Sequence, residues 1–389
     1  MAGYPNTETE RRYSWETLQY FVTEIFERSS MDPADARLLA ETLVQADLRG
    51  CHSHGVLRVP EYVQKLHKGG VNPRGVPRVV SERGGALVVD GGNSMGQIAS
   101  AFAMDKAIGK ARGSGVAVAA VRGSNHCGAL AYFAMMALRH DMIGLATTNA
   151  LPTMAPWGGT GKIVGINPLA VAVPAGEEDA IVIDAAFSAS SHGKIRIYQQ
   201  KGLAIPDNWA FDADGQPTTD PAAAIDGLLR PIGDYKGVGL AVVMGVLSAT
   251  LSGASYGTDL GSMTAGPHPG RDGQFLMALD VAAFVDAGEF KHQVDRIVRQ
   301  IRASRLAPGF DQVYSPGELE AVNERRYLIE GIPLNPNTVD DLINCAASLG
   351  VDTPIWSLDE AAARANASRC VTGCGEFGQP SGMPPPAHK

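Results

Sequence analysis

The segment GCHSHGVLRVPEY (Gly50–Tyr62) places two histidines, a serine, an arginine and a tyrosine within thirteen residues. An arginine can bind a carboxylate through two parallel hydrogen bonds, and an imidazole can exchange a proton with a neighbouring oxygen near neutral pH. If Ser53 caps the following helix, His54 lies in its first turn, and Arg58 and Tyr62 follow at four-residue intervals on one helical face. This spacing predicts a site for a small carboxylate substrate. The residues alone leave open a second interpretation, in which they form a solvated, capped helix face.

A second polar cluster, GSNHCG (Gly123–Gly128), follows the apolar run VAVAAV (116–121) and precedes an apolar helical segment. In α/β folds, ligands bind at the carboxyl ends of strands, and glycines beside the ligand allow a close approach of the backbone. His126 is therefore a candidate acid/base residue, with a structural capping role as the alternative.

Several other kinds of site are not supported by the spacing. His52 and His54 are two residues apart, which separates them by about 200° on a helix, so we expect no metal there and no functional role for His52. Cys370 and Cys374 have no second pair of metal ligands near them in the sequence, and an odd number of cysteines without repeated spacing is typical of reduced thiols. The segment GGTGK (158–162) does not complete a P-loop, no G-x-G-x-x-G follows a predicted strand, and no G-x-S-x-G is present.

The composition excludes several classes of partner. The chain has 389 residues, of which 45% are apolar and 19% charged, an ordinary globular profile long enough for two domains. The net charge of −8 is spread along the chain without a basic block, so we expect no nucleic-acid partner. No apolar run approaches the ~20 residues of a membrane-spanning helix, and the N-terminal segment lacks the hydrophobic core of a signal peptide, so we expect a cytoplasmic protein without membrane contact.

The elements that must position these residues change in character along the chain. Amphipathic spacing predicts helices at 14–28 behind Ser14, from Asp32-Pro33 onward, and at 59–68. Short apolar runs predict buried strands at 86–90, 116–121, 143–148, 169–173, 180–184 and 275–280. Further helices are predicted at 98–111, at 129–142, at 236–251, around Val294–Ile301, and behind Asn337 or Thr338.

This order of helices, an α/β block and more helices predicts the domain organisation. We expect a central α/β domain at 81–284 and a helical domain built from both chain ends, 1–80 and 285–379. A Pro-rich tail follows at 380–389.

The motifs together resemble the malate/L-lactate dehydrogenase family that lacks a Rossmann fold. That family also includes ureidoglycolate, sulfolactate and diketogulonate dehydrogenases and piperideine-2-carboxylate reductases. The matching residues fall in family order over about residues 14–350: Asp47, Gly50, Ser53-His54-Gly55, Arg58, Tyr62, Gly70, Asn72-Pro73, Ser124-Asn125-His126, Gly128, Pro156-Trp157-Gly158-Gly159, Asn167-Pro168-Leu169-Ala170, Asp184-Ala185-Ala186, Gly193-Lys194, Pro217–Pro221, Lys236–Ala241 and Ser315–Glu318.

The resemblance implies an NAD- or NADP-dependent dehydrogenase that transfers a hydride between nicotinamide and C2 of a small 2-hydroxy or 2-oxo acid. It also implies a homodimer and a mainly antiparallel, non-Rossmann α/β cofactor domain. Arg58 would hold the substrate carboxylate, and Tyr62 would be a second substrate-binding residue that supports the site. His54, His126 and Ser53 would be the catalytic residues, with either histidine as the proton carrier. The residues expected to line the dinucleotide are Asp184, Ala185, Ala186, Tyr235, Lys236, Pro316, Gly317 and Glu318.

Two departures from the family pattern bear on the substrate. Imine-reducing members have an acidic residue where this chain has Lys194, which makes a cyclic or N-methyl 2-imino acid the alternative substrate rather than the expected one. Cys127 replaces a frequent aromatic residue and is not expected to act as a thiol nucleophile. The motifs do not distinguish NAD from NADP, because the usual ribose signal belongs to the absent Rossmann motif.

Overall fold

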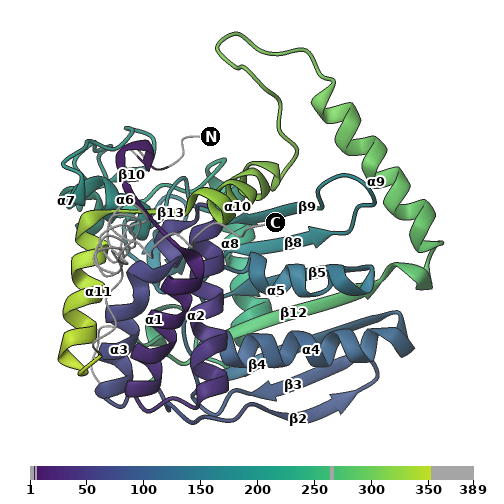
Figure 1. The fold of residues 1–389 in the computed structure, drawn as a ribbon, viewed down its shortest axis with the longest axis horizontal. Coiled ribbons are helices and arrows are strands. Elements are labelled where there is room, and N and C mark those ends of the chain that lie inside the picture. Colours follow the sequence, from purple (N-terminus) through teal and green to yellow (C-terminus); the bar gives the residue numbers. More distant parts are fainter. Residues whose placement is uncertain (1–3, 5–6, 263–266, 352–389) are drawn as a thin grey trace, which may run out of the picture.

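The computed structural model describes residues 4, 7–262 and 267–351 (Figure 1). The expectations for Cys370, Cys374 and the tail at 380–389 lie outside these described residues.

A seven-stranded sheet forms the centre of the fold, and the prediction of a mixed α/β fold with a mostly antiparallel sheet is confirmed. All neighbouring strands run antiparallel except β3 and β4, which are parallel. The strand order is β2 (Arg78–Arg83), β3 (Ala86–Asp90), β4 (Val116–Ser124), β12 (Asp272–Asp280), β5 (Met142–Thr148), β8 (Leu169–Val173) and β9 (Ile181–Ala185).

One face of this sheet is covered by α4 (Gly96–Ser114) and α5 (Ala131–Met136), which run along the strands in Figure 1. The strand register aligns Ala119, Leu276, Ala146, Ala170 and Asp184 across five strands. The first four are fully buried, and the small alanine side chains let the helices approach closely. Asp184 is the last residue in this row and lies on the edge strand β9.

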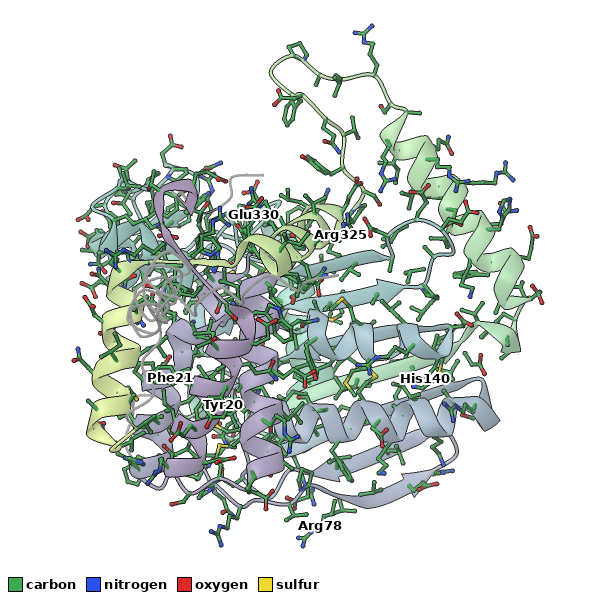
Figure 2. All side chains as sticks on the ribbon, viewed as in Figure 1. Tyr20, Phe21, Arg78, His140, Arg325 and Glu330 are labelled. Atoms are coloured by element: carbon green, nitrogen blue, oxygen red, sulfur yellow. The ribbon has the colours of Figure 1, made fainter. Side chains whose placement is uncertain are left out.

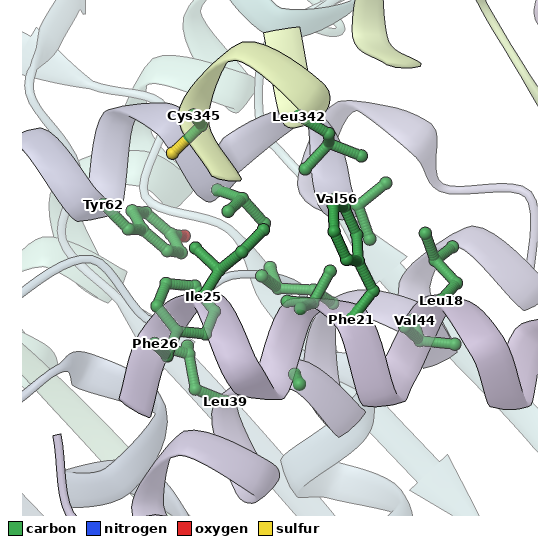
Figure 3. Packing of buried hydrophobic residues seen from close by; sticks show 14 of the residues in the cluster. Leu18, Phe21, Ile25, Phe26, Leu39, Val44, Val56, Tyr62, Leu342 and Cys345 are labelled. Carbon is green, nitrogen blue, oxygen red and sulfur yellow. The ribbon is translucent and has the colours of Figure 1, made fainter. Parts of the chain in front are cut away.

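The second core joins the two ends of the chain. It packs α1 (Trp15–Arg28), α2 (Pro33–Leu48) and α3 (Val59–His67) against α11 (Pro336–Ser348), and Figure 3 shows Ile25 and Tyr62 beside Leu342 and Cys345. Strands β1 (Arg11–Tyr13) and β13 (Ile332–Leu334) pair antiparallel, and Tyr13, Ile332 and Leu334 belong to this core. On α1, Phe21 is buried while the adjacent Tyr20 is 64% exposed, as the amphipathic pattern predicts (Figure 2).

Most predicted elements are confirmed, including the helix behind Ser14 and the helix that begins at Asp32-Pro33, where Asp32 is the N-cap. The strands β1 and β2 were not predicted, and the expected helix at 129–142 is shorter because it ends at Met136 and is followed by a 3-10 turn. The helix behind Asn337 or Thr338 instead begins at Pro336, with Asn335 as its cap. The apolar helix α8 (Tyr235–Gly245) continues into a π-helical turn at Val246–Thr250.

The remaining elements extend from this body. Helix α9 (Ala287–Arg302) projects from the sheet and its loop leads back to α10 (Glu318–Glu330), as Figures 1 and 2 show. Asp295 attaches α9 by accepting hydrogen bonds from the backbone N–H groups of residues 176–178 between β8 and β9. The other short elements are β6 (Pro152–Met154), β7 (Val164–Gly165), α6 (His192–Gln200), β10 (Ala210–Phe211), α7 (Pro221–Asp226) and β11 (Leu228–Leu229).

Candidate active site

The segment that carries His54 and Arg58 does not form the continuous helix expected from its spacing. Residues His52–His54 and Val56–Arg58 form two separate 3-10 turns, and α3 begins only at Val59, with Pro60 in its first turn. Ser53 is therefore not the cap of α3. Its hydroxyl instead lies 2.9 Å from Nδ1 of His54.

Asp47, at the end of α2, holds these two turns in place. One of its carboxylate oxygens lies 2.7 Å from Nδ1 of His52, and the other accepts the Val56 N–H at 2.8 Å. Gly55 passes so close to this carboxylate that a Cβ atom would lie 2.2 Å from it. His52 thus has a structural role through Asp47, which the sequence interpretation missed.

The two predicted polar clusters meet in space. The imidazole rings of His54 and His126 stack nearly parallel, with centroids 5.8 Å apart and an angle of 11° between their planes. The Tyr62 hydroxyl lies 2.7 Å from Nδ1 of His126, across 64 residues of sequence. His126 follows the carboxyl end of β4, as expected from the sequence.

Hydrogen bonds around His126 assign its tautomer. The amide Nε2 of Gln97 donates to the Tyr62 oxygen at 3.3 Å, which leaves the hydroxyl proton of Tyr62 directed at Nδ1 of His126. The backbone N–H of Gly128 donates to the same Nδ1 at 3.3 Å. Because Nδ1 accepts from both neighbours, the proton of the neutral ring is on Nε2. Gln97 lies within the apolar helix α4, and nothing in its sequence context marked it as part of this network.

Asn125 fixes the segment that presents His126. Its side-chain amide donates to the Ser94 carbonyl at 2.8 Å and its oxygen accepts the Gly270 N–H at 2.9 Å, with the side chain fully buried. Gly96 approaches so closely that a Cβ atom would lie 2.0 Å from the Asn125 carbonyl. These contacts leave the loop after β4 little freedom to shift.

Both histidines are held in the neutral form. Desolvation by the surrounding protein, followed by the positive charge of Arg58, lowers the pKa of His126 to about 3. The same two causes, with a further contribution from His126, lower the pKa of His54 well below its usual value of 6.5. A neutral imidazole can accept a proton at the ring nitrogen that carries none and donate a hydrogen bond from the other.

Arg58 is fixed by two contacts within the site. Its Nε donates to the Ser53 carbonyl at 2.9 Å and its Nη1 donates to Glu61 at 2.8 Å. Nη2 lies beside Gly193, where a Cβ atom would be 3.1 Å away. A guanidinium has five N–H donors, so its Nη1–Nη2 edge retains donors for a carboxylate.

A cavity of about 500 Å³ borders this cluster. Ser53 and His54 line it, whereas Arg58, Tyr62 and His126 are not among its lining residues and contact Ser53, His54 or each other instead. The cavity is also lined by Asp184, Ala186, Lys194 and Trp209.

The predicted cofactor residues are brought together only in part. Asp184 and Ala186 line the cavity, and Pro316–Glu318 lie beside them because the Pro316 carbonyl accepts the Val182 N–H at 3.0 Å. Gly317, with a φ of +85°, leaves no room for a Cβ atom, which would lie 2.6 Å from the Val182 carbonyl. Tyr235 and Lys236 begin α8 and do not line the cavity, and Tyr235 is 61% exposed.

Asp184 has an unusual environment for a carboxylate. Desolvation by the cavity walls raises its pKa to about 6, although N–H groups of Ala131 and Leu130 oppose the shift. The Ala131 N–H donates to it at 2.8 Å, which fixes the carboxylate at the start of α5. By contrast, burial raises the pKa of the Cys127 thiol to about 12, which agrees with the expectation that Cys127 is not a nucleophile.

Comparison with known proteins places this geometry in a family. The family model for malate/L-lactate dehydrogenase matches residues 13–343. The chain belongs to this family. The resemblance in the sequence is thereby confirmed, and the chain is an oxidoreductase of the malate/L-lactate dehydrogenase type.

Relatives within the family differ in substrate. The chain is 36% identical to L-sulfolactate dehydrogenase of Methanocaldococcus jannaschii, over 85% of this chain and 95% of that one. It is 34% identical to ureidoglycolate dehydrogenase (NAD(+)) of Escherichia coli, over 85% and 93%. It is 37% identical to a Δ1-pyrroline-2-carboxylate/Δ1-piperideine-2-carboxylate reductase of Pseudomonas putida, over 65% and 74%. The solved structure of malate dehydrogenase from Pyrococcus horikoshii superposes with a TM-score of 0.82 at 31% identity, covering 89% of this chain and 97% of that one.

Two further observations concern the described residues alone. No helix among them is long and apolar enough to cross a membrane. Within the same ranges, no group of three or more His, Cys, Asp or Glu side chains is arranged to hold a metal ion.

Proposed function

We propose that this dehydrogenase-family member transfers a hydride between NAD or NADP and C2 of a small 2-hydroxy or 2-oxo acid. The observation that carries the proposal is the joining of Arg58, His54 and His126 into one cluster beside a cavity. A guanidinium and two neutral imidazoles match the two polar groups of a 2-hydroxy acid, its carboxylate and its hydroxyl. The similarity to L-sulfolactate and ureidoglycolate dehydrogenases supports the same chemistry.

The residues around the cavity fit a dinucleotide. A volume of about 500 Å³ is typical of small-molecule sites, and Asp184 and Ala186 line it. Gly317 lets the segment 316–318 pack directly against Val182, two residues before Asp184. Asp184–Ala186 and Pro316–Glu318 would hold the dinucleotide, with Tyr235 and Lys236 contacting it from the start of α8. The bound nicotinamide would supply the hydride acceptor or donor.

The side chains of the site would bind the substrate carboxylate, accept the hydroxyl proton and donate a hydrogen bond to the hydroxyl oxygen. Arg58 binds the substrate carboxylate and so fixes the orientation of C2, with Tyr62 supporting the site through His126. His54, whose Nδ1 faces the Ser53 hydroxyl, accepts the hydroxyl proton at Nε2 during oxidation. His126 donates a hydrogen bond from Nε2–H to the same oxygen. Substrate carboxylate would offset the Arg58 charge that lowers both histidine pKa values, which favours the protonated ring needed for reduction.

The direct test is a matrix of both cofactors against a panel of 2-oxo acids. We expect loss of NADH or NADPH absorbance with at least one acid of the oxaloacetate or pyruvate type. No turnover with either cofactor across the panel would overturn the proposed function. The matrix also shows which dinucleotide the enzyme prefers.

A second candidate is reduction of cyclic or N-methyl 2-imino acids, which the similarity to the Pseudomonas putida reductase favours. The protonated imine group of such a substrate is positively charged, and Lys194 at the cavity would repel that group. Assays with piperideine-2-carboxylate, and with pyruvate plus methylamine, separate this reaction from 2-oxo acid reduction.

We also propose that the chain is a homodimer, with the domain division and cytoplasmic location expected from the sequence. Free thiols at Cys51, Cys127 and Cys345 support a reducing compartment.

Support for the dimer comes from α8 and its π-helical turn, where four apolar side chains are 46–56% exposed: Leu240, Val243, Val246 and Leu251. Apolar residues exposed together on one helix are typical of an interface.

Replacing Leu240 and Val243 together by Glu is expected to give a monomer, because two charges cannot be buried in an apolar interface. Sedimentation velocity measures the change, and Arg37→Glu, at an exposed position of α2, is the control that should remain dimeric. A wild-type protein that sediments as a monomer, or a double variant that stays dimeric, would contradict this interface.

A further inference from the structure

A lysine occupies a fully buried position of α3, where lysine side chains are found almost only with partners. Lys65 follows Tyr62 by three residues, so both side chains lie on the same face of the helix. Tyr62 contacts the ring of His126, whereas Nζ of Lys65 donates to the Ser262 carbonyl at 2.6 Å and to the His268 carbonyl at 2.5 Å. One helix therefore holds both the His126 ring and the segment that leads into β12.

The segment that this lysine holds also anchors Asn125. The Gly270 N–H donates to the Asn125 side-chain oxygen at 2.9 Å, and the Gly270 carbonyl accepts the Gly261 N–H at 2.7 Å. A Cβ atom on Gly270 would lie 2.8 Å from the same Asn125 oxygen, so the two residues pack closely. A displacement of this segment would therefore reach Asn125, which immediately precedes His126.

A charge interaction reinforces this connection. Asp272, the first residue of β12, is buried and pairs in register with Ser124, next to Asn125. Desolvation raises the pKa of Asp272 to about 7, and the positive charge of Lys65 opposes this rise. Loss of the ammonium would remove a donor from two carbonyls and a favourable charge from Asp272.

Resting on the proposed function, in which His126 donates a hydrogen bond to the reacting oxygen of the substrate, we propose that Lys65 is a positioning residue for His126. Through the segment that contains Gly270, and through Asn125, it fixes the loop that presents His126, while Tyr62 holds the ring. The hydrogen bond from His126 strengthens as charge develops on the substrate oxygen, so a displaced ring costs turnover rather than substrate binding.

The first test compares Lys65→Met with the wild type on the 2-oxo acid of the panel that is reduced fastest. We expect kcat to fall about 10- to 100-fold while the KM for the acid stays within about threefold, because Arg58 still binds the carboxylate. Lys65→Gln, which keeps a hydrogen-bond donor, should lose less activity. Lys68→Met, at the exposed C-cap of α3, is the matched control and should behave as the wild type.

A double-mutant cycle distinguishes positioning from general structural damage. If Lys65 acts through His126, Lys65→Met should lower kcat by less than about twofold in a His126→Ala background, because the group that it positions is already absent. Losses that multiply would overturn the proposal, as would a raised KM with an unchanged kcat. Thermal unfolding checks the fold of each variant, and Lys65→Gln replaces Lys65→Met in the cycle if the latter does not fold.

Hydrogen exchange measured by mass spectrometry makes the test independent of turnover. Lys65→Met should speed exchange in peptides that contain Gly270 and also in those that contain Gly128, whose N–H donates to Nδ1 of His126. Faster exchange confined to the Gly270 peptides would show that Lys65 fixes its own segment alone, which contradicts the proposal. If no acid of the panel is reduced, the proposed function fails, whereas faster exchange in both sets of peptides would still support the connection from Lys65 to His126.

Discussion

Replacing His54 by Gln is expected to lower kcat by about 10²- to 10⁴-fold, whereas His126→Gln is expected to cost less than about tenfold. The difference follows from the assigned hydrogen bonds. Nδ1 of His126 accepts from Tyr62 and from the Gly128 N–H, so its reactive nitrogen carries a proton and can only donate. A glutamine amide also donates a hydrogen bond, but no amide can accept the proton that we assign to His54.

Alanine variants complete this comparison. His126→Ala removes the donor and should lower kcat by about 10²- to 10³-fold, the usual effect of losing one group that stabilises a developing oxyanion. His54→Ala should behave like His54→Gln. If glutamine restores activity at position 54 but not at position 126, the two roles are reversed. Thermal unfolding of each variant shows whether a loss of activity reflects a loss of fold.

The pH profile gives a second readout of the same assignment. In alcohol oxidation, kcat/KM reports the pKa values of the free enzyme. Desolvation and Arg58 hold the pKa of His54 well below 6.5, so the base is already neutral at and below that pH. We therefore expect kcat/KM for 2-hydroxy acid oxidation to stay level as the pH falls through 6.5. An acid limb centred near 6.5 would show that neither buried histidine is the base.

Much of the fold could be predicted because its strands are short apolar runs between turn residues. Runs such as 116–121 and 169–173 lie in the central sheet, and each of their residues is buried or half-buried. The strand β2 was missed because five of its six residues are exposed, so its sequence, RVVSER, shows no buried alternation. The strand β1 has only three residues and depends on its partner β13, which is more than 300 residues away.

The site was predictable as two local clusters but not as one network. Residue types and glycines marked the segments around His54 and His126, yet their contact depends on how β4 and α3 pack. Local spacing also placed the helix start at Ser53, whereas the constraints of Gly55 and Pro60 delay it to Val59. Gln97 and Trp209 could not be found, because an isolated polar or aromatic residue carries no signal of a distant partner.

Replacing Arg58 by Met is expected to lower kcat/KM for a 2-oxo acid by about 10²- to 10⁴-fold, mostly through a higher KM. Two charge-assisted hydrogen bonds to the substrate carboxylate are lost, each contributing about 1.5–3 kcal/mol. Arg58→Lys keeps the positive charge but cannot form two parallel hydrogen bonds to the carboxylate, so kcat/KM should fall by an intermediate factor. Added guanidine should restore part of the activity of a smaller variant, Arg58→Ala, by occupying the vacated position.

Arg58 also contacts the Ser53 carbonyl and Glu61, so its loss could act through the fold rather than through the substrate. Glu61→Gln breaks the ion pair while keeping the guanidinium, and it should retain a KM within about threefold of wild type if the substrate contact dominates. The pH profile separates the two explanations further. Arg58 is the largest charge that lowers the pKa of both histidines, so Arg58→Met should move the acid limb of the oxidation profile upward, toward neutral pH. A variant with lower activity but an unshifted pH profile would show that the charge of Arg58 does not lower the pKa of the histidine that acts as the base.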